Sequence, residues 1–143
     1  MREAIQGDVH DKDIQKAEDD FKIKIESTWH VALQKLPIIY GFDFAGTRTN
    51  IEAWLELKNR NFTVGTYDDT MINLNKWMKA KELRDTTKIS TYLCIRFEDI
   101  DVYTKLTDYT PMEIKWGART KQTRDWQDIG PAVHIPISEF TQF

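Results

Sequence analysis

The run from Lys88 to Phe97 constrains the fold more than any other segment of this chain. In an extended strand, the residues at 89, 91, 93, 95 and 97 point to one side, and four of the five are large and apolar. Tyr92 and Cys94 point to the other side, so both sides carry apolar groups. Such strands are typical of sheets that are covered on both faces. We therefore expect a central strand with packed layers above and below it.

Length and composition fit one domain with a sizeable core. The chain has 143 residues, 41% of them hydrophobic, and cores of about 100–150 residues are the commonest size. A single domain over residues 1–143 is therefore expected. No apolar run approaches the roughly 20 residues of a membrane-spanning helix, and the amino terminus lacks the apolar stretch of a secretory signal. Cys94 is the only cysteine and cannot form an internal disulfide, which favours a reducing, cytoplasmic setting.

Residue patterns predict an alternation of helices and strands. Apolar residues recur at three- and four-residue intervals over 11–36, which predicts a long helix closed by Pro37. A second helix is expected over 71–85, with an N-cap cluster at 68–70. The predicted strands cover 38–45, 51–60, 62–67, 88–97, 102–106, 112–116 and 132–137. This order predicts an α/β (α+β) fold, with a mixed sheet flanked by helices and extra C-terminal β elements.

The hairpin predicted from the first two strands brings polar side chains together. Along 51–60, apolar and polar residues alternate, so Glu56 and Lys58 point to the same side. Asp43 joins them only if the numbers of paired residues add up to an odd sum. Pairing Asp43 with Glu56 leaves a two-residue turn, and pairing Gly41 with Glu56 leaves a four-residue loop. An even sum would put Asp43 on the apolar face, where an unpaired charge is costly. Burial therefore favours a shared face for the three charged residues.

Two carboxylates beside an ammonium group suit a metal-assisted reaction at a phosphate. Asp43 and Glu56 would repel each other unless a cation lies between them. Mg²⁺ is typically held by one or two carboxylates together with waters and substrate phosphate. Such an ion polarises a phosphoryl oxygen and lowers the pKa of its bound water. Lys58 is suited to orient that water or to balance charge in the transition state. These residues point to phosphodiester hydrolysis.

Asp43 followed by Glu56-Leu57-Lys58 resembles the signature of the PD-(D/E)XK nuclease superfamily. The predicted order of helix, three strands, helix and strand is also similar to its restriction-endonuclease-like αβββαβ core. The resemblance implies that Asp43 and Glu56 bind Mg²⁺, or Mn²⁺ in its place. It further implies that Leu57 offers its backbone carbonyl to the metal and that Lys58 assists the attacking water.

The resemblance extends beyond this motif, over about residues 11–97, and is to small Holliday-junction-resolvase-like or phage-type endonucleases. Many members add a glutamate from the first helix, and Glu26 is expected to take that role here. Some members place a polar residue of the second helix near the phosphate, and Lys76 is the corresponding residue. Phe42 stands where the motif often has a proline. Small resolvase-like members often dimerise, so the resemblance leaves a homodimer open.

A basic segment between two tryptophans is a further candidate for contact with nucleic acid. Arg119, Lys121 and Arg124 lie between Trp116 and Trp126. Such a segment can follow a phosphate backbone while its rings stack on bases. More often it is a solvated loop with its aromatic rings in the core. The net charge of −3 argues against a strong non-specific nucleic-acid binder but does not exclude a nuclease.

Three functions compete. The leading expectation is a Mg²⁺-dependent deoxyribonuclease that acts on DNA in repair, recombination or processing, and no membrane partner is expected. The alternative is a non-catalytic module that keeps the nuclease fold and binds nucleic acid or a protein, which the acidic balance motivates. The third is an unrelated α/β subunit, in which Glu56 and Lys58 form a structural ion pair and Asp43 is a hairpin-edge acid. In that case Glu26 and Lys76 are ordinary helix-surface residues.

Overall fold

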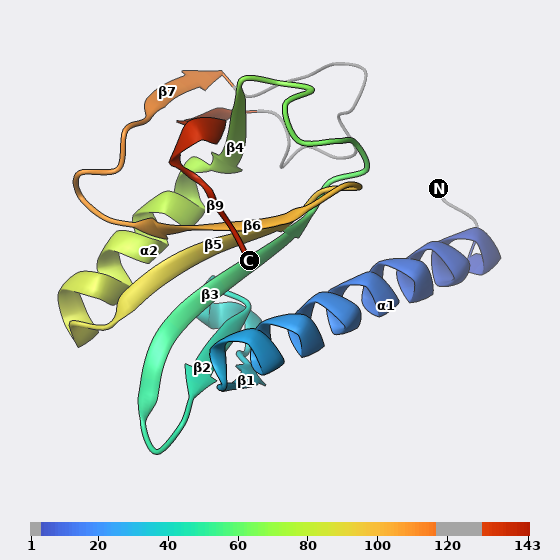
Figure 1. Cartoon of the computed structure of the whole chain (residues 1–143), viewed down its shortest axis with the longest axis horizontal. Coiled ribbons are helices and arrows are strands. Elements are labelled where there is room, and N and C mark those ends of the chain that lie inside the picture. The colour runs from blue at the N-terminus through green and yellow to red at the C-terminus, as the bar shows by residue number, and fades with distance from the viewer. Residues whose placement is uncertain (1–3, 117–129) are drawn as a thin grey trace.

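The computed structural model describes residues 4–116 and 130–143, which form two sheets and two α-helices (Figure 1). The main sheet has six strands in the order β1-β2-β3-β5-β6-β9, and the small sheet has three in the order β4-β8-β7. The helices are α1 (Ala4–Trp29) and α2 (Leu74–Thr87), with short 3-10 turns η1 (Ile38–Tyr40) and η3 (Ile137–Glu139). The strands are β1 (Ala32–Lys35), β2 (Phe44–Thr47), β3 (Ile51–Asn59), β4 (Asp69–Asn73), β5 (Ser90–Arg96), β6 (Asp101–Leu106), β7 (Glu113–Trp116), β8 (Pro131–Pro136) and β9 (Thr141–Gln142).

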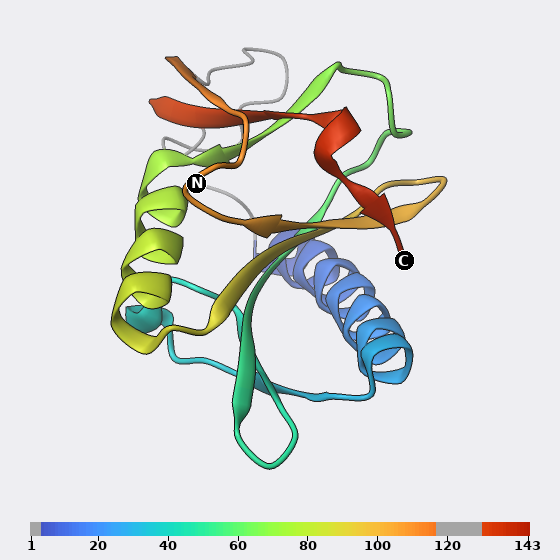
Figure 2. The same cartoon turned by 60° about the vertical axis from the view of Figure 1, so that its left-hand side comes forward.

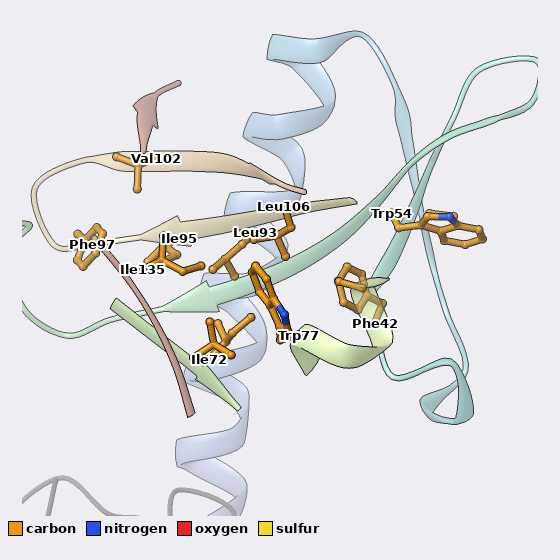
Figure 3. Close-up of a cluster of buried hydrophobic side chains, with 13 residues drawn as sticks. Phe42, Trp54, Ile72, Trp77, Leu93, Ile95, Phe97, Val102, Leu106 and Ile135 are labelled. Atoms are coloured by element: carbon orange, nitrogen blue, oxygen red, sulfur yellow. The ribbon is translucent and has the colours of Figure 1, made fainter. Parts of the chain in front are cut away.

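The main sheet lies between two layers, as Figures 1 and 2 show. Helix α1 covers one face, where Phe21 and Ile25 pack with apolar residues of β1, β2, β3 and β5. Helix α2 and the small sheet cover the other face, where Trp77 packs near Phe42 in the larger apolar cluster (Figure 3). Each large side chain buried in this way contributes about 1.5–3 kcal/mol. The two apolar clusters therefore hold both layers to the sheet.

The prediction of a two-sided central strand is confirmed by β5. It pairs in parallel with β3 and antiparallel with β6, which makes the sheet mixed as expected. Leu93 and Ile95 belong to the apolar cluster on the α2 side, whereas Cys94 belongs to the cluster on the α1 side. The predicted α/β (α+β) fold is therefore confirmed, including the extra β elements towards the C-terminus.

The first predicted helix is wrong at its C-terminal end. Helix α1 ends at Trp29, His30 adopts a left-handed conformation with φ of 54°, and residues 32–35 form the edge strand β1. The Glu26 carboxylate accepts a hydrogen bond from the backbone N–H of Leu33 at 2.9 Å, which holds the start of this strand. Leu33 is buried, and both a helix and a strand over residues 32–35 would bury it. Pairing with β2 therefore decided in favour of the strand.

Three other boundaries differ from the predictions. Residues 38–40 form η1, so the strand predicted over 38–45 begins only at Phe44. No strand forms over 62–67, and β4 lies further along in the small sheet, paired with β8. Because 69–73 is a strand, α2 begins at Leu74 and not at 71, capped by the Asn73 side chain instead of residues 68–70. Because β4 pairs with β8, a strand about 60 residues away, the residues around 69–73 alone do not indicate that a strand forms there. Three main-sheet strands, β1, β2 and β3, still precede α2.

Candidate active site

The β2–β3 hairpin has the odd-sum register that burial favoured. Phe44 pairs with Leu55 and Ala45 with Trp54, the register that sets Asp43 opposite Glu56. A bulge between Gly46 and Thr47 shifts the last pair, so residues 48–50 connect the strands in place of a two-residue turn. The predicted register is therefore confirmed, and the bulge changes only the connection.

Asp43 lies one residue before β2 begins, next to the part of the β3 edge that β2 does not pair with. Its Oδ2 accepts a hydrogen bond from the backbone N–H of Leu57 at 2.9 Å. The N–H and C=O of one strand residue point to the same edge. The Leu57 carbonyl therefore also points towards the edge where Asp43 lies. The carbonyl that the resemblance assigned to a metal thus faces the side of the first carboxylate.

Glu56 is the most deeply buried charged residue of this region, with 2% of its surface exposed. Its Oε2 lies 3.4 Å from Nζ of Lys58, and its Oε1 lies 3.3 Å from Nζ of Lys76. Burial raises the pKa of Glu56; Lys58 and Lys76 oppose this shift, and the negative charge of Asp43 adds to it. Net attraction to the two lysines therefore does not compensate the cost of burying this carboxylate.

Lys76 reaches Glu56 from helix α2, in the layer that covers the sheet on the side away from α1. It lies on α2, and its Nζ donates a hydrogen bond to the carbonyl oxygen of Gly41 at 2.8 Å as well as contacting Glu56. The structure thus places Lys76 beside the predicted catalytic residues. Its role in binding nucleic acid stays a prediction.

The structure adds two residues that the sequence analysis missed, Lys35 and Glu18. Nζ of Lys35 lies 3.1 Å from Oε1 of Glu18 and 3.8 Å from Oδ1 of Asp43. Glu18 therefore contacts the lysine that faces Asp43. The helical spacing of 18, 21 and 25 was an available signal, because it sets Glu18 on the same face of α1 as the buried residues Phe21 and Ile25.

The other predicted site residues lie apart or are not described. Glu26 accepts the hydrogen bond from Leu33 at the start of β1, and no described contact joins it to Asp43 or Glu56. Its assisting role stays a prediction that this placement does not favour. Arg119, Lys121 and Arg124 lie outside the described residues.

The oxygen groups of Asp43, Glu56 and Leu57 suit a divalent ion that keeps part of its water shell. Residues 4–116 and 130–143 hold no cluster of three or more His, Cys, Asp or Glu side chains. Two carboxylates and one backbone carbonyl are too few for a protein-only cage. They fit Mg²⁺ or Mn²⁺, since Mg²⁺ takes one or two carboxylates and completes its shell with water and phosphate. Burial is the main cause of the raised pKa of Glu56, and a cation between the two acids would offset the smaller contribution from the charge of Asp43.

A mixed sheet covered on both faces, with charged groups on β3 and directly before β2, is the arrangement of the restriction-endonuclease-like fold. The chain belongs to a family described as phage putative PDDEXK endonuclease, whose profile matches residues 9–143. The predicted relationship to PD-(D/E)XK nucleases is therefore confirmed.

A solved structure with a similar fold is that of Archaeoglobus fulgidus Hjc, a Holliday junction resolvase from an archaeal hyperthermophile. The TM-score is 0.57 at 10% sequence identity, over 90% of this chain and 90% of that chain. At that identity the likeness shows the shared fold. No curated protein sequence matches the chain significantly. Among the described residues, no helix is long and apolar enough to cross a membrane.

Proposed function

We propose that this protein is a DNA endonuclease that hydrolyses phosphodiester bonds with Mg²⁺ or Mn²⁺. The single observation that carries the proposal is Glu56, a buried carboxylate of raised pKa that faces a second acid and two lysines. Titratable groups perturbed in this way concentrate at functional sites. Membership of an endonuclease family supports the reaction class.

The roles of the residues follow from their positions. Asp43, Glu56 and the Leu57 carbonyl would hold the metal, which when bound polarises a phosphoryl oxygen and lowers the pKa of its water. Lys58 lies beside Glu56 and is placed to orient the attacking water. Lys76, held by the Gly41 carbonyl, is placed to contact the scissile phosphate from the α2 side.

Glu18 takes the place that the sequence analysis gave to Glu26. It fixes Lys35 against Asp43, so it acts as a positioning residue for the first carboxylate. Glu26 is instead tied to the backbone of Leu33. We infer that Glu18 is the helix acid that supports the site.

Further parts of the proposal concern the substrate, the biological role, the assembly, the domain and the cellular location. DNA as substrate is supported by the endonuclease family and by the resolvase whose fold is shared. The same two relationships support a proposed role in repair, recombination or processing. A homodimer, one domain over residues 1–143 and a cytoplasmic setting remain part of this proposal, and sedimentation of the purified protein tests the first.

The deciding experiment measures cleavage of supercoiled plasmid, single-stranded DNA and branched DNA with Mg²⁺ or Mn²⁺. Glu56→Gln keeps the shape of the side chain and removes its charge, so cleavage should be lost. Glu52→Gln is the matched control, because Glu52 lies on the same strand but is exposed and pairs with Arg48. Equal inactivity of the wild-type protein and Glu56→Gln on every substrate would remove the catalytic proposal.

A non-catalytic module of the same fold is the second candidate. The observation that favours it is that lysines already surround both carboxylates, Lys35 at Asp43 and Lys58 with Lys76 at Glu56. Calorimetry separates the two functions, because a metal-dependent enzyme should release or absorb heat on binding Mn²⁺ and Glu56→Gln should not. A salt titration of DNA binding then shows whether the module reads the phosphate backbone.

A further inference from the structure

Two neighbouring isoleucines project from the protein beside the candidate active site. Ile38 and Ile39 in η1 are 97% and 84% exposed, and Tyr40 follows them, also exposed. Burial of apolar surface is what stabilises a fold, so these two exposed side chains contribute little to it. In Figure 2, η1 lies at the outer edge of the molecule, next to α2. Adjacent exposed isoleucines at this place call for a binding partner.

Local hydrogen bonds define the conformation of the turn. Its backbone is closed by two hydrogen bonds, from Tyr40 N–H to the Pro37 carbonyl at 3.0 Å and from Gly41 N–H to the Ile38 carbonyl at 2.9 Å. Gly41 ends it in the left-handed conformation with φ of 70°. An apolar tip whose backbone already has a defined conformation loses little backbone entropy on binding. The turn is therefore suited to insertion into a partner.

The same turn is tied to the candidate site. The Gly41 carbonyl accepts the hydrogen bond from Lys76, and Lys76 contacts Glu56. Asp43 follows only two residues after Gly41. Whatever occupies the candidate site therefore lies close to the backbone that ends this turn.

The charges around the turn fit a nucleic acid better than a second copy of this chain. The side chain of Lys79 runs along Gly41, where an added Cβ would lie 3.0 Å from its Cγ, and Lys35 lies just before the turn. Their ammonium groups contact Glu82 and Glu18, and these exposed ion pairs would open for a phosphate. Apolar groups flanked by lysines match a duplex, with bases inside and phosphates outside. A stable contact between proteins uses about 20–30 residues a side, far more than this tip offers.

We propose that Ile38 and Ile39 form a wedge that enters the base stack of the DNA beside the scissile phosphate. Isoleucine is one of the side chains that enter base steps and partly unstack them. The inference rests on the proposed function and deepens it, since it names the substrate class. The preferred substrate is a duplex with a step that is already weakened, by a nick, a bulge or a junction.

The test compares the double variant Ile38→Ser/Ile39→Ser with a matched control, Ile23→Ser/Ile114→Ser, which alters exposed isoleucines elsewhere. Binding is followed with duplexes that carry 2-aminopurine at an intact step or beside a nick, without added divalent metal. Cleavage of the same duplexes and of single-stranded DNA is measured with Mg²⁺. Circular dichroism confirms that both variants are folded.

We expect the wild-type protein and the control to raise 2-aminopurine fluorescence, and the double variant not to. Cleavage of intact duplex should fall about tenfold in the double variant, while cleavage of single-stranded DNA, which has no stack to open, should change less than about twofold. The loss of cleavage on the nicked duplex should lie between these two values.

Three results would overturn the wedge. Unchanged fluorescence and duplex cleavage in the double variant would remove it and leave the nuclease intact. A change from dimer to monomer in sedimentation, with fluorescence per subunit unchanged, would assign the tip to a second copy of this chain. A wild-type protein that cuts no DNA would remove the proposed function and the wedge with it.

Discussion

Two carboxylates of the main sheet are buried to almost the same extent, yet their surroundings differ. Glu56 on β3 is 2% exposed and Asp101 on β6 is 7% exposed. Arg96 donates two hydrogen bonds to Asp101, at 2.8 and 3.1 Å, and Lys24 donates a third at 2.6 Å. Although burial acts to raise the pKa of Asp101, these hydrogen bonds lower it below its usual value. The pKa of Glu56 is raised.

The difference shows that burial alone does not identify a functional carboxylate. Asp101 meets a bidentate guanidinium, which satisfies both of its oxygens. Glu56 meets two single ammonium groups at 3.3 and 3.4 Å and the like charge of Asp43. A fully paired acid holds elements of the fold together. An incompletely compensated acid keeps affinity for another cation, so Glu56 is the one suited to a metal.

The largest expected effect is on the rate of DNA cleavage, which should depend on Glu56 and not on Asp101. Glu56→Gln should lower the rate of DNA cleavage by at least about a hundredfold, because it removes a charged oxygen ligand of the proposed metal. Asp101→Asn should leave the rate per folded molecule unchanged. Cleavage assays of both variants at equal folded concentration decide the matter. Similar losses in the two variants would end the distinction.

The role of Asp101 should instead be measurable as a change in the free energy of unfolding. Asp101→Asn should lower the free energy of unfolding at neutral pH by about 2 kcal/mol, because it weakens charged hydrogen bonds to Arg96 and Lys24. Since folding lowers the pKa of Asp101, this stabilisation is present above about 3.9, the value of an unfolded aspartate, and is lost as the pH falls through the folded pKa. Urea unfolding between pH 7 and pH 2.5 should show the two proteins converging.

A smaller effect separates the two acids of α1. Glu18→Gln should lower the cleavage rate by about tenfold, comparable to removing a group that orients a metal ligand, because Lys35 is then less firmly held beside Asp43. Glu26→Gln should lower stability and leave the rate within about twofold. Kinetics at saturating Mg²⁺, together with thermal unfolding, test both. A larger loss of cleavage in Glu26→Gln than in Glu18→Gln would show that Glu26, and not Glu18, is the helix acid that supports the site.

The smallest effect concerns the stability cost of the ionised Glu56. Because folding raises the pKa of Glu56, its protonated form is favoured in the folded state. This contribution is complete below about 4.3, the pKa of an unfolded glutamate, and is lost as the pH rises through the folded pKa. Without metal, Glu56→Gln should therefore unfold at a higher temperature than the wild-type protein at pH 7 to 8. At pH 4 the two should agree, and an equal gap at both pH values would contradict the raised pKa.

The main features of the fold and the motif could be predicted because they depend on local patterns. The alternation along 51–60 and the two-sided run at 88–97 gave β3 and β5. The cost of burying an unpaired charge gave the register around Asp43. The end of α1 could not be predicted, because residues 32–35 fit a helical pattern equally well and only their pairing with β2 makes them a strand. The position of β4 could not be predicted, because its partner β8 is distant in sequence.

By itself, the sequence determined the layered architecture and the motif of Asp43, Glu56 and Lys58, because side-chain periodicity fixes which residues share a face. Only the tertiary structure brought Lys35 of β1 and Glu18 of α1 to Asp43. Lys76 of α2 was expected from the resemblance, and the structure set its distance from Glu56. The physical reason is that a charge interacts with whatever the packing of layers brings within a few ångströms, and sequence separation does not measure that distance.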